Sequence, residues 1–358
     1  MNNKIKDKVV TILFSSILII FFLINAIKKD DDISISERRK LEKFPTLTIN
    51  NLMDGTFFKK FETYTTDQFI KRDYFRKLKV NLELNIKKNY NNLYNYNGYI
   101  VEQTFPLNKN SIINLANKMN SIKETYLTNN NIYFTIVPDK NYFINNGNLK
   151  LDYNELTNLM KNNLKDFNYI DIFSILNLDD YYKTDTHWKQ ENIKKVALLL
   201  SKNMNFDFYD NYNELEITSF KGVYSGQLPI KTELDKITIL TNDIIKNSTV
   251  YNYETKKETE VYDLTKVNSL DKYDIYLSGA VSIIDIINNN SSNKELIVFR
   301  DSYGSSLVPL LIQGYKKITV IDTRYVSPKI LNEYVNFNNK DVLFIYGVIS
   351  VNNSSSIR

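Results

Sequence analysis

The sequence predicts an α/β fold, in which a mostly parallel sheet is flanked by helices and preceded by one N-terminal transmembrane helix. The first observation is the uncharged, apolar run at residues 9–27. The second is a series of short apolar segments that alternate with segments of helical periodicity from residue 109 onward. Such alternation is typical of a sheet whose strands are joined by helices. Sheets of this kind place their functional residues at the carboxyl ends of the strands.

The uncharged run is long enough to cross a membrane. At about 1.5 Å per residue, a helix over residues 9–27 spans about 28 Å, close to the thickness of the hydrocarbon core. Lys4, Lys6 and Lys8 precede the run and favour a cytoplasmic N-terminus. Because no small-residue cleavage pattern follows, we expect an uncleaved signal anchor rather than a cleaved signal peptide. Both interpretations place the rest of the chain outside the cytoplasmic membrane.

The expected organisation has four parts. They are a cytoplasmic tail at 1–8, a transmembrane anchor at 9–27, a membrane-proximal helical segment at 28–105 and an α/β domain at 106–358. In the membrane-proximal segment, apolar spacing over 55–88 predicts two helices. Asn97-Gly98, between two apolar runs, predicts a hairpin at 94–101.

Within the α/β domain, residues 295–322 predict the clearest unit. A strand at 296–299 leads through a sharp turn into a helix at 305–312, and a second strand follows at 318–321. This is a βαβ unit, whose crossover should be right-handed. The other predicted helices are 111–126, 153–164, one after 188, and 328–335. The other predicted strands are 132–137, 169–172, a hairpin at 248–263, 273–277 and 342–346.

The composition excludes several kinds of chemistry. The 358 residues include no Cys and one His, so a thiol nucleophile, a disulfide, a Cys-ligated metal and a three-His zinc site are impossible. Imidazole chemistry must use His187. A formal net charge of +5 is too small to indicate a nucleic-acid-binding face. The acidic run at 30–32 lacks the spacing of a cation-binding loop, so we expect no metal and no cofactor.

Three residues could carry acyl-transfer chemistry. Ser302 lies between a predicted strand and a predicted helix, which would expose its hydroxyl and place its N–H at a helix N-terminus. Asp185 and His187 are two residues apart, so an extended loop would place them on one face. A carboxylate beside an imidazole fixes the imidazole tautomer. The structural alternatives are a helix-capping Ser302 and a surface His187. His187 adjoins Trp188, the only Trp, which distinguishes this segment.

Two segments resemble a known family. Asp185-Thr-His-Trp188 and Arg300-Asp-Ser-Tyr-Gly304 resemble the SGNH-hydrolase-like domain of the alginate O-acetylation proteins AlgJ and AlgX, and resemble still more closely their Gram-positive relatives, the DHHW proteins. DHHW proteins carry Asp-His-His-Trp at the first segment, and the Thr of this chain matches the AlgJ and AlgX form. Segments at 36–45, 67–73, 220–225 and 322–325 look like DHHW-protein segments too, so the resemblance covers nearly the whole ectodomain.

The resemblance implies an SGNH-like fold with a triad of Ser302, His187 and Asp185. It also implies that a membrane-bound O-acyltransferase supplies acetyl groups, which an extracytoplasmic acetyl-serine then passes to a polysaccharide hydroxyl. Gly222 as an oxyanion donor and Arg324 as a substrate contact complete the predicted site. A turn glycine and an ion-paired arginine are the structural alternatives for these two. The alternative functions are a carbohydrate acetyl-esterase and a non-catalytic polysaccharide-binding or scaffold protein.

Overall fold

The computed structural model describes residues 3–288 and 292–358 of the chain. They form two compact units, one of residues 1–90 with 225–231 and the other of residues 91–224 with 232–358. We call them the anchor unit and the sheet unit. The hairpin predicted around Asn97-Gly98 is confirmed as β3 (Leu93–Tyr96) and β4 (Tyr99–Glu102). It belongs to the sheet unit, so the two units divide before this hairpin, whereas the sequence places the boundary at residue 105.

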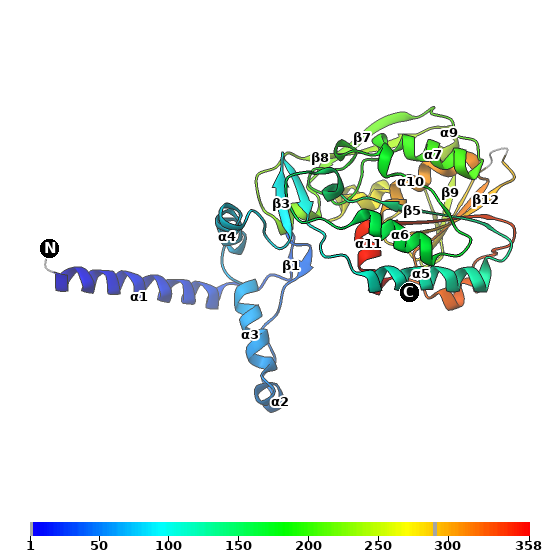
Figure 1. Ribbon diagram of the computed structural model, residues 1–358. Helices are drawn as coiled ribbons and strands as arrows, with labels where there is room; N and C mark the ends of the chain where they lie inside the picture. Colours follow the sequence, from blue (N-terminus) through cyan, green and yellow to red (C-terminus); the bar gives the residue numbers. More distant parts are fainter. Residues whose placement is uncertain (1–2, 289–291) are drawn as a thin grey trace. The chain divides into compact units, whose positions relative to one another are not determined.

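The anchor unit is mostly helical, and its residues 3–90 are drawn in shades of blue in Figure 1. Its first helix, α1 (Asn3–Ile27), is the one helix among the described residues that is long and apolar enough to cross a membrane. The two helices predicted over 55–88 are confirmed as α3 (Thr56–Asp67) and α4 (Arg72–Lys87). A short helix, α2 (Ile49–Met53), and a two-stranded ribbon of β1 (Ile33–Ser34) and β2 (Arg39–Lys40) complete the unit.

The sheet unit is built on an eight-stranded sheet with the order β10-β9-β11-β13-β12-β14-β5-β6. From β13 to β6 all neighbours are parallel, whereas β10, β9, β11 and β13 pair antiparallel. The parallel strands are β13 (Lys317–Ile321), β12 (Glu295–Arg300), β14 (Asp341–Gly347), β5 (Asn131–Val137) and β6 (Asn168–Tyr169). The others are β9 (Thr249–Asn252), β10 (Lys257–Thr259) and β11 (Ile283–Ile287). This confirms the predicted α/β fold with a mostly parallel sheet.

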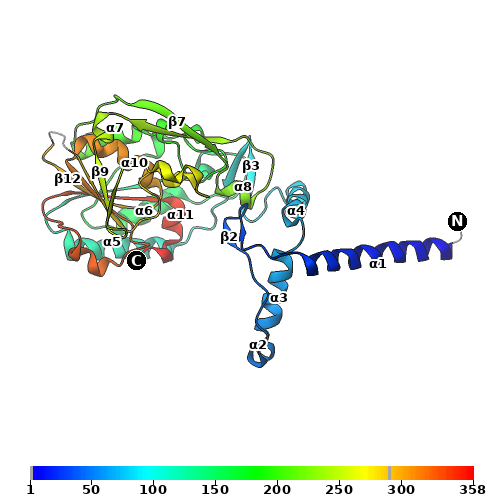
Figure 2. The ribbon, with the colours of Figure 1, turned by 180° about the vertical axis from the view of Figure 1, so that it is seen from behind.

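Helices cover both faces of this sheet (Figures 1 and 2). Alternate residues of a strand point to opposite faces, and in β12 Leu296 and Val298 enter one apolar cluster while Ile297 and Phe299 enter the other. The first cluster includes α7 (Lys194–Met204) and α10 (Tyr303–Leu311). The second includes α5 (Lys109–Tyr126), α6 (Tyr153–Asn163) and α11 (Val348–Asn352). The remaining short helices are α8 (Val223–Gln227) and α9 (Asp243–Lys246).

The predicted βαβ unit is confirmed as β12, α10 and β13, with the two strands parallel. Two predicted elements are wrong. The strand expected at 273–277 is the 3₁₀ helix η6 (Lys272–Ile275), because the Asp271 side chain accepts a hydrogen bond from the Tyr273 N–H and starts a helical turn. The helix expected at 328–335 is the shorter 3₁₀ helix η8 (Pro328–Glu333). The hairpin of β7 (Asn213–Phe220) and β8 (Asp235–Thr241) was not predicted.

Candidate active site

The loop that carries Asp185 and His187 is the tip of a tight turn. At its base Tyr181 and Trp188 form an antiparallel bridge. The Tyr182 N–H donates to the His187 carbonyl oxygen at 3.0 Å, and the Lys189 N–H donates to the Asp180 carbonyl oxygen at 2.7 Å. The backbone on both sides of the tip is therefore held, which fixes where its side chains can point.

Asp185 and His187 form a buried pair. His187 Nδ1 lies 2.6 Å from Asp185 Oδ1, and the His187 N–H also donates to this oxygen at 3.1 Å. Asp185 Oδ2 accepts the Val223 N–H at 3.0 Å. A carboxylate only accepts hydrogen bonds, so Nδ1 must carry the proton, and in the neutral ring the Nε2 lone pair is free. Among residues 3–288 and 292–358, the buried Nε2 atom has no hydrogen-bond partner.

The electrostatics of the pair favour the ionised carboxylate. Burial alone would raise the pKa of the Asp185 carboxyl. The charge and hydrogen bonds of His187, with the Val223 N–H, outweigh burial and lower the pKa of Asp185 below its ordinary value. Asp185 is therefore ionised across the physiological range, and it can hold the imidazole in one tautomer and stabilise an imidazolium.

Ser302 lies where β12 ends and α10 begins, as the sequence predicts. It occupies the N-cap position, yet its side chain makes no capping hydrogen bond. Asp301 does this instead, since its Oδ1 accepts the Tyr303 N–H at 3.1 Å. The Ser302 side chain is partly exposed. In the described part of the chain, no acceptor pairs with the Ser302 N–H, whereas the N–H of Gly304 donates to the Asp301 carbonyl oxygen. The hydroxyl and the N–H of Ser302 are thus both available.

Residues next to His187 and next to Ser302 connect the loop tip to the start of α10. The Tyr303 hydroxyl donates to the Thr186 carbonyl oxygen at 2.9 Å. Trp188 Nε1–H donates to the Tyr303 carbonyl oxygen at 3.2 Å and to Ser306 Oγ at 2.9 Å. The rings of His187 and Tyr303 meet edge to face with centroids 5.4 Å apart. The residue after Ser302 therefore touches His187 and both of its neighbours, and the structure brings the two predicted segments together.

Tyr273 is a site residue that the sequence did not indicate. Its ring stacks on His187, with centroids 3.8 Å apart and an angle of 7° between the planes. Its hydroxyl bonds to Ser306 Oγ at 2.7 Å, and the ring is buried. The stack blocks one face of the imidazole and restricts rotation of the ring. No local pattern marks Tyr273, because it reaches His187 from a separate 3₁₀ helix.

Two further buried, ionisable side chains form hydrogen bonds to the loop, and the sequence analysis did not identify them. Asp235 accepts the N–H groups of Lys183 and Thr184 at 2.7 Å each, and the Thr184 hydroxyl at 2.5 Å. Lys140 Nζ donates to the carbonyl oxygens of Tyr182 and Lys183 at 3.0 and 3.3 Å. Of these two residues, only Lys140 could have been noticed in the sequence, because it comes soon after the carboxyl end of the predicted strand at 132–137.

Lys140 is unusual among the lysines because it is buried. Burial lowers the pKa of its ammonium group to about 7. The negative charges of Asp185, Asp235, Asp139 and Glu102 oppose this effect but do not cancel it. The state of Lys140 therefore changes near neutral pH, next to a loop that carries two of the predicted catalytic groups.

Gly222 packs directly against the loop. Its N–H donates to Thr184 Oγ1 at 2.7 Å, so an oxyanion would have to share or displace this bond. A Cβ atom at Gly222 would lie 2.4 Å from both the Thr184 carbonyl oxygen and the Asp185 Cβ atom. The absence of a side chain at Gly222 is what lets the two segments approach.

Arg324 comes after the end of β13, and Ser302 comes after the end of β12. These two strands are parallel neighbours, so both residues lie at the same edge of the sheet. Its guanidinium donates to both carboxylate oxygens of the buried Asp322, at 2.9 and 2.6 Å. Burial lowers the pKa of Arg324, but the Asp322 carboxylate outweighs burial and raises it. The group is thus a fixed, partly exposed cation with its hydrogen bonds directed to Asp322.

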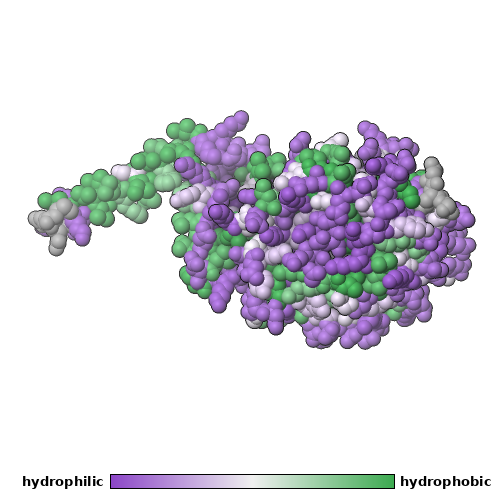
Figure 3. Space-filling view, turned by 90° about the horizontal axis from the view of Figure 1, so that it is seen from above, coloured by the Kyte–Doolittle hydropathy of each residue, from purple (hydrophilic) through white to green (hydrophobic). Residues whose placement is uncertain are grey.

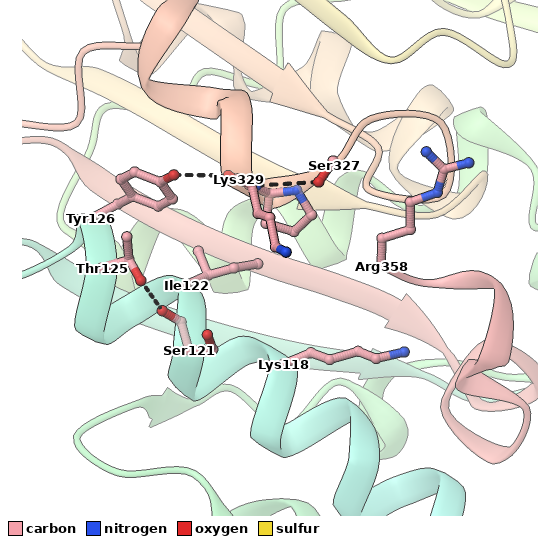
Figure 4. A pocket seen from close by; sticks show the side chains of 9 residues that line it. Lys118, Ser121, Ile122, Thr125, Tyr126, Ser327, Lys329 and Arg358 are labelled. Atoms are coloured by element: carbon pink, nitrogen blue, oxygen red, sulfur yellow. Dashed lines mark hydrogen bonds between the residues drawn. The ribbon is translucent and has the colours of Figure 1, made fainter.

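The predicted site residues do not line the cavity in Figure 4. That cavity, of about 520 Å³, lies beside α5. Its labelled basic residues are Lys118, Lys329 and Arg358, and Figure 4 shows no aligned acid–base pair among its side chains. Within residues 3–288 and 292–358, no cluster of three or more His, Asp or Glu side chains could hold a metal ion.

Comparisons with solved structures identify proteins that share this fold. No family model matches the chain, and no curated protein does. A DHHW family protein from Eubacterium siraeum is 18% identical with a TM-score of 0.61, and the match covers 76% of this chain and 96% of that one. Bacillus cereus PatB1 with a sulfonyl adduct is 18% identical with a TM-score of 0.58, covering 73% and 97%. The O-acetyltransferase domain of Pseudomonas putida AlgJ matches more weakly, at 10% identity and a TM-score of 0.42, covering 72% and 90%. The chain therefore has the fold of a DHHW family protein, as the resemblance of its two motif segments implied.

Proposed function

We propose that this chain is a membrane-anchored, extracytoplasmic O-acetyltransferase that acetylates a cell-surface or secreted polysaccharide through an acetyl-serine. The observation that carries the proposal is the buried Asp185–His187 pair, whose unpartnered Nε2 atom belongs to a loop bonded to the start of α10. The Ser302 hydroxyl at that start does not cap its helix. Serine acyl transfer requires a base with a free lone pair that can reach such a hydroxyl.

The first half-reaction loads the enzyme. Ser302 Oγ bonds to the carbonyl carbon of an acetyl donor while its proton passes to His187 Nε2. The Ser302 N–H has no other acceptor among the described residues and would hold the developing oxyanion. The donor oxygen then leaves with the proton from the imidazolium. Asp185 stabilises the imidazolium during this step.

The second half-reaction unloads the enzyme. The acceptor hydroxyl gives its proton to Nε2 as its oxygen bonds to the acetyl carbon, and Ser302 Oγ leaves with that proton. A polysaccharide acceptor makes the chain a transferase, and water makes it an acetyl-esterase. A membrane-bound O-acyltransferase is the proposed acetyl supplier, since α1 would hold the catalytic unit at the membrane surface. Gly222 and Arg324 remain proposed oxyanion and substrate contacts.

Intact-mass spectrometry tests the covalent step. The purified full-length protein in detergent is mixed with p-nitrophenyl acetate, and Ser302→Ala and His187→Ala are treated in parallel. We expect an adduct of about 42 Da that maps to Ser302, is absent from Ser302→Ala and forms far more slowly in His187→Ala. No adduct and no ester turnover in the parent protein would favour the binding or scaffold function.

Two further reactions refine the test. A sulfonyl group reacts with an activated hydroxyl, and PatB1 was solved with a sulfonyl adduct. An aryl sulfonyl fluoride should therefore modify Ser302 in the parent and leave Asp185→Asn largely unmodified. Adding acetylated enzyme to an oligosaccharide then separates the two activities. Acetyl transfer to the sugar indicates a transferase, whereas release of acetate alone, unaffected by the sugar, indicates an esterase.

A further inference from the structure

The anchor unit exposes its apolar side chains instead of burying them. Helix α2 has no buried residue, α3 buries only Asp67 and α4 buries only Val80. Met53 is 85% exposed, Ile86 79% and Phe58 62%. A water-soluble helix of mixed composition normally hides its apolar face in a core. The large apolar side chains that are at least partly open to the surroundings are Phe44, Leu47, Ile49, Leu52, Met53, Phe57, Phe58, Phe61, Phe75, Leu78, Leu82 and Ile86.

This surface is continuous with α1. The Phe21 ring of α1 stacks on Phe69 with centroids 5.6 Å apart, and it meets Phe75 edge to face at 6.2 Å. The Asn25 side chain accepts the Ile70 N–H at 2.8 Å. The end of the candidate membrane helix is therefore attached to the turn between α3 and α4. Figure 3 shows α1 as mostly hydrophobic, with hydrophilic residues at its N-terminal end.

An apolar cavity of about 730 Å³ lies where these helices meet, within the anchor unit. Hydrocarbon side chains of Leu18, Phe22 and Phe61 line it. The polar side chains in its wall are already paired, since Tyr64 donates to Asp30 and Gln68 bonds to the backbone of Asp31. Ordered water needs two or more polar partners, so this cavity suits a hydrocarbon occupant better than water.

The net charge of the anchor unit's helices also favours lipid as the occupant. Residues 56–88 contain nine Lys and Arg but only four Asp and Glu, a net charge of +5. The whole chain also has a formal net charge of +5, so basic and acidic residues balance elsewhere. Basic helices that expose large apolar side chains are typical of segments that lie in the interface of an anionic bilayer.

We propose that α2, α3 and α4 lie in the headgroup region of the membrane that α1 enters, bind anionic phospholipid, and accommodate lipid acyl chains in the cavity beside Phe22 and Phe61. The anchor unit then holds the chain at the bilayer surface through an interfacial contact in addition to a single span. The inference does not depend on the proposed acetyl transfer, because no predicted catalytic residue belongs to the anchor unit.

The absence of Cys from the chain makes a site-specific test direct. Single-cysteine variants Met53→Cys, Phe58→Cys and Ile86→Cys carry an environment-sensitive fluorophore in the full-length protein. Leu264→Cys and Leu270→Cys are the controls, because these leucines are also exposed, at 49% and 51%, but lie in the sheet unit. Each labelled protein is reconstituted into phosphatidylcholine vesicles with and without phosphatidylglycerol. Quenching by acyl-chain-nitroxide lipid and by aqueous iodide is measured.

We expect the labels at 53, 58 and 86 to be quenched several-fold more by the nitroxide lipid than the control labels, and several-fold less by iodide. This contrast should be stronger in vesicles with phosphatidylglycerol. Equal iodide quenching at all five positions would overturn the proposal. So would shielding that appears only when a second membrane protein is added, which would make the surface a protein-docking site. Equal shielding in neutral and anionic vesicles would overturn the anionic-lipid part. Unchanged melting temperatures confirm that each variant folds.

Discussion

At the scale of single residues, the site depends on which atom holds each proton. Asp185 accepts at Oδ1 and so places the imidazole proton on Nδ1. The opposite ring nitrogen, Nε2, keeps its lone pair and is the proposed base. Tyr273 covers one face of the ring, so this nitrogen has little freedom to turn away.

Asp185→Asn tests this assignment with almost no change in shape. The Asn amide can donate to Nδ1, which moves the imidazole proton to Nε2 and removes the base. We expect a loss of acetyl-serine formation on the order of 10⁴-fold, with little change in melting temperature. Single-turnover rates with p-nitrophenyl acetate measure it. A variant that retained a tenth of the parent rate would contradict the proposed role of Asp185.

Lys140 should make stability depend on pH. Burial lowers its pKa from 10.5 to about 7, so between these values the unfolded chain holds a proton that the folded chain lacks. Stability therefore rises with pH across this window, by at most about 1.4 kcal/mol per pH unit. Lys140→Met should remove this part of the slope. The melting temperature of the detergent-solubilised chain, measured from pH 7 to pH 10, tests it.

The control for this experiment is Lys202→Met, at an exposed position on α7. Its melting temperature should follow the parent at every pH. If Lys140→Met also followed the parent slope, the ammonium group of Lys140 would have to stay charged in the fold, held by the carbonyl oxygens of Tyr182 and Lys183.

At the scale of elements, close approach of segments makes the site. The loop with Asp185 meets the segment at 220–224, the start of α10 and the 3₁₀ helix that carries Tyr273. These contacts join parts of the chain that are far apart in sequence. Each contact constrains the position of His187 from a different direction.

Gly222→Ala should disturb the site through this packing. The new methyl group would lie 2.4 Å from the Thr184 carbonyl oxygen, so the backbone must shift. We expect a destabilisation of about 1–3 kcal/mol and a fall in acetylation rate of at least tenfold. Thermal melts and single-turnover assays measure both. Ser219→Ala, at an exposed position on β7, should change neither, and a fully active Gly222→Ala would show that the loop tolerates displacement.

An element could be predicted where the residues that indicate it follow one another in the sequence. The strand, turn and helix around Ser302 were predicted because their apolar runs and polar turn are consecutive. Strand β7 was missed because most of its residues are exposed, which leaves no apolar alternation. Strand β11 was missed because Asp285 interrupts its apolar run, and only the fold supplies its partners Thr319 and Tyr253.

The site follows the same rule. The sequence singled out Asp185, His187 and Ser302 as candidates because each stands in a short, distinctive segment. It did not identify Tyr273 or Asp235, whose contacts with the loop exist only once distant segments are packed. For Gly222, the sequence could indicate a special position, but the hydrogen bond from its N–H to Thr184 appears only in three dimensions.

At the scale of the whole molecule, we expect catalysis and membrane contact to belong to different units. Every predicted catalytic residue lies in the sheet unit, whereas α1 and the exposed apolar helices lie in the anchor unit. Chemistry and membrane contact should therefore respond to different changes.

Deletion of residues 1–27 should change membrane binding and leave the chemistry unchanged. We expect the shortened protein to keep the ester-cleaving rate of the parent and to change from an integral to a peripheral membrane protein. It should float with anionic vesicles at low salt, and alkaline carbonate should release it, whereas the full-length chain should stay bound. Vesicle flotation measures both. A shortened protein that never binds vesicles would contradict the interfacial role of α2 to α4.

The two carboxylate oxygens of Asp301 have a consequence for protein engineering. One oxygen starts α10 through the Tyr303 N–H, and the other accepts the Gly347 N–H and the Ser350 hydroxyl at 2.7 Å each. The backbone around Ser302, the proposed nucleophile, is thus held by the side chain of its neighbour Asp301. We expect that residue 302 can be exchanged for an amine-bearing analogue without unfolding the helix, so that an amide, which resists hydrolysis, accumulates in place of the ester. A chain of this kind is well suited to retaining the acyl group that its donor delivers, so that the mass of that group can be measured.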